Sequence, residues 1–226
     1  MGLLAPQVWA RDPADVGKRA RRTQLPISPK ASQQGLHSLD AVYTAHDCGP
    51  TTRLVRVGDR EADVYDVWAA PRPAGGDLLM RAAWARGVQG AERSVWAPGT
   101  AHPVGAPLQW KVPRRGPQAA RDATLALRFW PVTLRPPRQR QREGLPVVTL
   151  WAVPVQEVEP PADGTPIAWL LLPTVAVDTV DAATHCGQWY AWRWGMEVGH
   201  RILQSGWRLA ARQRASGERW QRCLTL

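Results

Sequence analysis

The segment RVGDREADVYDVW, residues 56–68, joins the end of an apolar run to a cluster of acidic side chains. Residues 54–57 have the pattern of a β-strand, Gly58 interrupts it, and the alternation from Glu61 to Ala70 predicts a helix. Asp59 is therefore expected where a strand ends and a helix begins, a position at which reacting groups are often found. The alternative is a helix cap, in which Asp59 accepts hydrogen bonds from free backbone N–H groups.

The composition is that of a folded protein with a real core. The chain has 226 residues, 44% of them hydrophobic, enough for one domain or for one large and one small lobe. Its longest apolar run, residues 167–177, is interrupted by Pro173 and is shorter than the roughly 20 residues that cross a bilayer. The first residues lack the features of a signal peptide. We therefore expect a cytoplasmic protein without a membrane partner.

Cysteine and histidine give no sign of a metal or disulfide framework. Cys48, Cys186 and Cys223 lie far apart and form no Cys-x-x-Cys pair, and the five histidines have no ligand-like spacing. This excludes the common zinc modules from consideration.

The charge balance points to an anionic partner. Lysine and arginine total 29 against 19 acidic residues, giving a formal net charge of +10 and a sequence pI of about 10.7. Nucleic acid is the commonest partner of such a chain. Because arginine greatly outnumbers lysine, a GC-rich coding sequence is an alternative source of this composition.

The rest of the chain predicts an α/β protein in three parts. Residues 1–90 contain a weak helix at 38–45 and strands at 52–57 and 77–84, after a strand-like start. Residues 91–166 alternate apolar and polar positions between Pro and Gly turns, the pattern of an antiparallel sheet, and RPPRQRQR at 135–142 is expected to be a mobile basic hairpin tip. Residues 167–226 contain a strand at 167–172, a long helix from about 179 to 203 and a shorter one at 215–224.

The predicted long helix concentrates its polar residues on one face. In WYAWRWGMEVGHRILQSG, residues 189–206, six such side chains share an arc of about 100° at helical spacing, while the opposite arc is apolar. They are Tyr190, Arg193, Glu197, His200, Arg201 and Gln204. A solvated face with a Glu197–Arg201 ion pair, worth a few tenths of a kcal/mol, is the alternative to a functional face.

Several motifs resemble those of one enzyme family. The spacing Tyr190-x2-Arg193-x3-Glu197 resembles the Y-R-E-K signature of bacterial insertion-sequence transposases of the DDE class, in the hairpin-forming group. GDREADVYD at 58–66 resembles the second catalytic-aspartate motif of that family. WLLLPTVAV at 169–177 resembles the strand before the signature helix, and GLLAPQVWARDP at 2–13 resembles the segment after the first catalytic strand. The resemblance covers most of the chain, in the correct order.

The resemblance implies an incomplete RNase H-like catalytic core, at residues 1–90 and 167–226, interrupted by an antiparallel β-strand insert at 91–166. It also implies a cut-and-paste transposase fragment acting in DNA recombination, by phosphodiester hydrolysis and transesterification. In this family two Mg²⁺ or Mn²⁺ ions are held by two aspartates and a glutamate, because one cation generates the nucleophile and the other stabilises the leaving oxygen. Asp59 would be the second aspartate and Glu197 the glutamate.

The same resemblance implies a DNA-binding face and its partners. Trp169 would stack a flipped base, although core packing is the alternative in a chain with 13 tryptophans. The partner would be double-stranded DNA at transposon ends, bound by a homodimer in the bacterial nucleoid. The residues expected near phosphates are Tyr190, Arg193, His200, Arg201 and Arg81.

Departures from the family pattern predict impaired catalysis. The first catalytic aspartate belongs on a strand upstream of residue 1, the signature lysine is replaced by Gln204, and KASQQGL at 30–36 differs from the family pattern. We therefore expect a relative truncated at both ends that lacks activity, because two carboxylates in place of three should fail to hold the metals. A non-catalytic DNA-binding remnant, an active enzyme completed by another chain, and an unrelated β-rich binding module are the alternatives. Glu61, Asp63 and Asp66 are expected to be helix N-terminal and surface charges.

Overall fold

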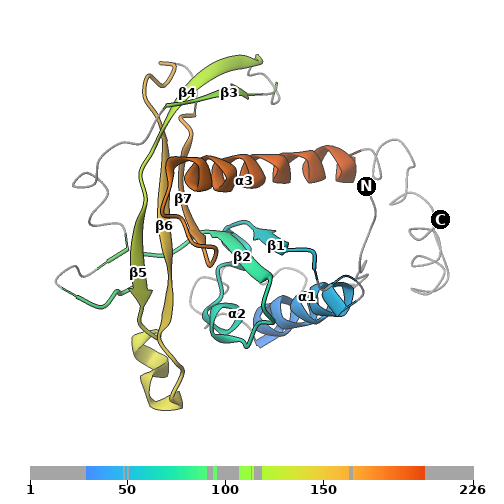
Figure 1. Ribbon diagram of the computed structural model, residues 1–226. Coiled ribbons are helices and arrows are strands. Elements are labelled where there is room, and N and C mark those ends of the chain that lie inside the picture. The colour runs from blue at the N-terminus through green and yellow to red at the C-terminus, as the bar shows by residue number, and fades with distance from the viewer. Residues whose placement is uncertain are drawn as a thin grey trace, which may run out of the picture.

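The computed structural model describes residues 29–47, 51–90, 107–112, 119–162 and 165–201, together with residues 49, 94, 95 and 114. Seven strands form a mixed sheet with helices on both faces (Figure 1), which confirms the α/β class. The expected strand near the N-terminus and the helix at 215–224 lie outside the described residues.

The first half of the described chain alternates helix and strand. It contains α1 (Pro29–Asp47), β1 (Leu54–Gly58), the 3₁₀ helix η3 (Arg60–Ala62), α2 (Tyr65–Ala69) and β2 (Gly76–Arg81). The helix predicted over residues 61–70 is instead divided in two, because Val64 has an extended backbone and Asp63 turns the chain between η3 and α2. The weak helix predicted at 38–45 is longer than expected and spans 19 residues.

The second half is an antiparallel meander that ends in one long helix. It contains β3 (Leu108–Val112), β4 (Arg121–Leu127), β5 (Trp130–Leu134), the 3₁₀ helix η4 (Arg138–Glu143), β6 (Val148–Glu157), β7 (Ala168–Pro173) and α3 (Val180–Arg201). The strand order is β1-β2-β7-β6-β4-β3, and β5 pairs with β6. Only β1 and β2 pair in parallel among the described strands. Strands from the predicted insert thus continue the same sheet as β1, β2 and β7.

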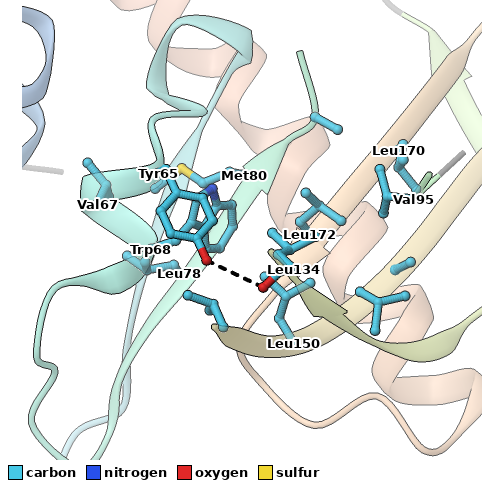
Figure 2. Close-up of a cluster of buried hydrophobic side chains, with 14 of the residues drawn as sticks. Tyr65, Val67, Trp68, Leu78, Met80, Val95, Leu134, Leu150, Leu170 and Leu172 are labelled. Carbon is cyan, nitrogen blue, oxygen red and sulfur yellow. Dashed lines mark hydrogen bonds between the residues drawn. The ribbon is translucent and has the colours of Figure 1, made fainter. Parts of the chain in front are cut away.

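The central strands are buried on both faces, which explains their continuous apolar sequences. Leu78 and Met80 of β2 face a cluster shared with α1 and α2, whereas Leu79 faces the cluster beneath α3. In β7, Leu170 and Leu172 face the first cluster in the same alternation. Figure 2 shows the first cluster, where Tyr65 and Trp68 of α2 pack toward the β5–β6 hairpin.

The corner after β1 requires glycine. A Cβ atom on Gly58 would lie 2.6 Å from the Cβ of Ala62 and would also collide with the sulfur of Met80. Glycine therefore lets η3 approach the end of β1, and this close approach fixes the position of the next residue, Asp59. None of the helices in the described part of the chain is long and apolar enough to cross a membrane.

Candidate functional site

Asp59 is both a helix cap and a member of an ion pair. It follows β1, caps η3 and accepts a hydrogen bond from the Glu61 N–H to Oδ1 at 3.0 Å. Its Oδ2 accepts a hydrogen bond from Arg193 Nη2, also at 3.0 Å. The capping alternative is thus confirmed, and the same carboxylate contacts the predicted signature helix.

The Asp59–Arg193 pair joins segments 134 residues apart. Arg193 projects from α3 across the end of β1, and the two side chains are 21% and 36% exposed for Arg193 and Asp59. A pair with this exposure contributes at most about 1 kcal/mol to stability. Its importance is positional, because it brings together two residues that the sequence assigns to one site.

Arg81 ends the strand next to β1, and its side chain reaches toward β7. It is the last residue of β2, and the neighbouring parallel strand β1 ends where Gly58 pairs with Met80. It follows Leu79 by two residues, so its side chain lies on the α3 face of the sheet. Arg81 Nη2 donates to the carbonyl of Ala168 at 3.1 Å, at the start of β7.

Trp169 and Tyr190 lie next to each other in the core. Their rings meet edge to face, with 4.9 Å between centroids, and the residues are 5% and 2% exposed. Trp169 therefore packs in the core in this structure, which is the alternative to its predicted role of stacking a flipped base. In this arrangement both rings face protein. Among the predicted DNA-binding residues whose side chains the structure describes, Arg193 and Arg81 are partly exposed.

The remaining predicted residues belong to the end of α3. Glu197, His200 and Arg201 are within the helix, but their side chains lie outside the described part of the structure. Of the two predicted catalytic residues, Asp59 and Glu197, the structure therefore describes the side chain of Asp59 alone. Both of its oxygens already accept hydrogen bonds from protein donors.

The described residues do not fit a two-metal centre. Within the described ranges, no group of three or more His, Cys, Asp or Glu side chains is placed to hold a metal ion. The guanidinium of Arg193, 3.0 Å from Asp59, also lies beside the carboxylate where a metal cation would bind, and it already compensates the negative charge of Asp59. Cys186, a free cysteine, is buried, and burial raises the pKa of its thiol to about 12, so it offers no thiolate.

Asp63 was wrongly predicted to be a surface charge. It is 1% exposed, and its Oδ1 accepts hydrogen bonds from Trp68 Nε1 at 3.1 Å and from Arg86 Nε at 2.8 Å. Its Oδ2 accepts from the Ala83 N–H at 2.8 Å. This network ties the η3 corner to the loop after β2. Local sequence gave no signal of it, because Ala83 and Arg86 lie at least 20 residues away.

The other two acidic residues of the segment differ from each other. Glu61 is exposed in the first turn of η3, as predicted. Asp66 lies in the first turn of α2, as predicted, but it also forms an ion pair with Arg140 of the predicted basic hairpin tip, residues 135–142.

A comparison of the chain with protein-family models gave no match.

Proposed function

We propose that this chain is a DNA-binding protein related to the DDE transposases, with an impaired catalytic centre. The observation that carries the proposal is the ion pair between Asp59 and Arg193 at the carboxyl end of β1, next to the strand β2 that ends in Arg81. The sequence resemblance assigns the same three residues to one site. The partner is duplex DNA, with transposon ends as the expected natural form.

The charge of the site supports phosphate binding. Arg193 and Arg81 are two arginines on the α3 face at the carboxyl ends of the parallel strands, and Asp59 neutralises part of the charge of Arg193. Guanidinium groups bind phosphate oxygens through paired N–H donors. The chain's formal net charge of +10 adds a long-range attraction toward a polyanion.

The engagement of Asp59 supports impairment. The Asp59 carboxylate accepts hydrogen bonds from Arg193 and from the Glu61 N–H, and the positive charge of Arg193 opposes the binding of Mg²⁺ or Mn²⁺ at the same carboxylate. Gln204 replaces the lysine of the family signature and removes one phosphate-binding charge. We therefore expect DNA binding without strand cleavage.

Filter binding across a salt series tests the binding. The logarithm of the association constant should fall with the logarithm of salt concentration at a slope of about −0.9 per phosphate contacted, and Arg81→Gln should reduce that slope by about one. Asp59→Asn should strengthen binding more than Glu61→Gln, because each removes one carboxylate but only the first removes the negative charge paired with Arg193. A salt-independent interaction would contradict the proposal.

A cleavage assay with Mn²⁺ tests the impairment. Wild-type protein should leave a labelled duplex intact. If nicked or hairpin product appears, and Asp59→Asn abolishes it while Glu61→Gln does not, the chain is an active metal-dependent enzyme. The impairment would then be wrong, whereas the assignment of Asp59 to the site would stand.

A further inference from the structure

The segment between β5 and β6 is the most basic part of the described chain. Residues 135–143 read RPPRQRQRE and carry four arginines within eight positions; we call them the basic tip. In the structure they form η4 and project beyond the ends of β5 and β6, as the yellow coil in the lower part of Figure 1. The sequence predicts a mobile basic hairpin tip, and the structure gives this segment specific contacts with α2.

Arg140 anchors the basic tip to the body of the protein. Its Nη1 and Nη2 donate to the two carboxylate oxygens of Asp66 at 2.7 and 2.9 Å, in a bidentate pair. Its Nε donates to Glu143 at 2.9 Å. The hydrogen bonds to Asp66 and Glu143 raise the pKa of Arg140 above its usual value. One arginine of the tip is thus committed to structure.

Tyr65, which precedes Asp66 in α2, holds the base of the tip. Its hydroxyl lies 2.8 Å from the carbonyl oxygen of Pro146 and 3.3 Å from that of Leu134, on the two sides of the hairpin. Figure 2 shows the hydrogen bond to Leu134. Pro136 and Pro137 further restrict the backbone leading into η4. Consecutive residues of α2 therefore fix both the base and the middle of the tip.

The other three arginines of the tip point outward. Arg135, Arg138 and Arg142 are exposed, and none of them forms an ion pair with another residue that the structure describes. Their mutual repulsion brings no benefit to the isolated protein. An ordered array of unpaired guanidiniums is instead a preorganised surface for an anion with several charges.

A groove at the foot of the tip extends this surface. It has a volume of about 650 Å³, and it is bordered by the residues that follow the tip and by those between α2 and β2. Arg53 and Arg72 line it; Arg53 is 57% exposed at its side chain and pairs with Asp77 at 2.7 Å. Its charged lining is therefore positive on balance, with two guanidiniums against one carboxylate.

The tip and groove lie far from Asp59. The groove borders residues that precede β1 and β2, whereas Asp59 follows the end of β1. Since β1 and β2 run parallel over five paired residues, the groove and Asp59 are separated by roughly 17 Å at about 3.3 Å per residue. A phosphate bound at the groove is therefore a different phosphate from one bound near Asp59.

We propose that the basic tip and its groove form a second binding surface, which contacts the phosphate backbone of duplex DNA without reading its sequence. This inference rests on the proposed function in taking DNA as the partner, and it adds a contact distant from Asp59. Between residues 135 and 143 the tip has arginine, glutamine, proline and one glutamate, but no aliphatic or aromatic side chain that could enter a lipid bilayer. This composition favours a nucleic-acid backbone over an anionic membrane.

Matched charge-removal variants test the second surface. The tip variant is Arg138→Gln with Arg142→Gln; the control is Lys111→Gln with Arg114→Gln, two exposed cations at β3, so both variants lower the net charge by two. The probe is a duplex of roughly 30 base pairs of arbitrary sequence, titrated across salt concentrations. Circular dichroism and thermal unfolding confirm that each variant is folded.

The tip variant should lose about tenfold or more in affinity near 0.1 M salt, and its salt slope should fall by about 1.8, for two phosphates. The control should change affinity by less than about twofold. Equal losses in both variants would reduce the effect to net charge and overturn the inference, as would no loss in the tip variant. Binding to phosphatidylserine vesicles without binding to duplex would also overturn it.

A third arm separates this inference from the proposed function. If Arg81→Gln weakens binding and the tip variant does not, the second surface fails and the site at Asp59 stands. If the tip variant weakens binding and Arg81→Gln does not, the tip stands and the site at Asp59 loses its DNA contact. If wild-type protein binds no duplex, both fail.

Discussion

At the scale of the residue, Asp63 is the side chain on which the η3 corner most depends. Its buried carboxylate accepts hydrogen bonds from several protein donors, among them the guanidinium of Arg86, whose side chain is 8% exposed. Removing one partner of a buried ion pair leaves the other charge uncompensated, at a cost of about 3–5 kcal/mol. The corner that carries Asp59 thus depends on a residue with no direct part in the site.

We therefore expect Asp63→Ala to lower the free energy of unfolding by about 3–5 kcal/mol, measured by urea denaturation. Glu61→Ala is the matched control, because it removes a carboxylate two positions away that is exposed, and it should change stability by less than about 0.5 kcal/mol. Equal losses in the free energy of unfolding for the two substitutions would show that the buried hydrogen-bond network of Asp63 adds no stability beyond that of an exposed carboxylate.

The residues also show what could be read from the sequence. Asp59 and Arg193 were predicted to share a site because a strand end and a helical spacing are local patterns, and the structure brings them together at 3.0 Å. The burial of Tyr190 against Trp169 was not predictable, because the helical wheel gives a face but not which face meets the sheet. The role of Asp63 was missed for a related reason, since its partners are distant in sequence.

At the scale of the element, Glu157 fastens three strands at one end of the sheet. It lies at the end of β6, forms an ion pair with Arg121 of β4, and accepts a hydrogen bond from the Ile167 N–H just before β7 at 3.0 Å. Burial alone would raise the pKa of Glu157, but the hydrogen bonds from Arg121 and Ile167 outweigh it and hold the pKa below the ordinary value of 4.5. The folded protein therefore binds this proton less readily than the unfolded chain.

This direction fixes the pH dependence. The stabilisation from Glu157 should be complete above about pH 4.5, the ordinary value, and should be lost as the pH falls through the lower folded pKa. Urea denaturation of wild type and Glu157→Gln should show a difference in stability that shrinks in that acidic range. Glu159→Gln, an exposed carboxylate two residues away, controls for the loss of a charge. A difference that grew on acidification would contradict the sign.

The basic tip shows how far an element can be predicted. Its hairpin position follows from alternating apolar strands on both sides of a Pro-rich, charged segment, and the antiparallel pairing of β5 with β6 confirms it. Its anchoring does not follow from local pattern, because Asp66 lies 74 residues before Arg140. The positive charge of the tip could therefore be predicted from the sequence, whereas its contact with Asp66 could not.

A charge-neutral substitution tests whether that order matters for binding. Asp66→Asn combined with Arg140→Gln removes the anchor while the formal net charge stays at +10, since one negative and one positive charge are lost. We expect weaker duplex binding by about tenfold or more, because the three outward arginines must then be ordered on binding, at roughly 0.5–1.5 kcal/mol per immobilised side chain. Unchanged affinity would show that charge alone suffices.

At the scale of the whole molecule, the sheet separates two positively charged regions. The α3 face carries Arg193 and Arg81 at the carboxyl ends of the parallel strands, and the α2 face carries the basic tip near their amino ends. Composition predicted an anionic partner for the chain as a whole but could not say that the charge is divided. The division of charge is visible only in the folded chain, where Arg53 and Arg72 line the groove and Arg138 lies in the tip.

The division predicts additive losses of affinity. Sites more than 7–10 Å apart that share no partner usually add within about 0.5 kcal/mol, and the two regions are separated by roughly 17 Å along the parallel strands. Combining Arg81→Gln with the two tip substitutions should therefore multiply the separate losses in association constant for a duplex of about 30 base pairs, and the reductions in salt slope should sum to about three. Filter binding of the single, double and triple variants at one salt series measures both quantities. A combined loss well below the product would contradict the prediction that the two regions contact different phosphates.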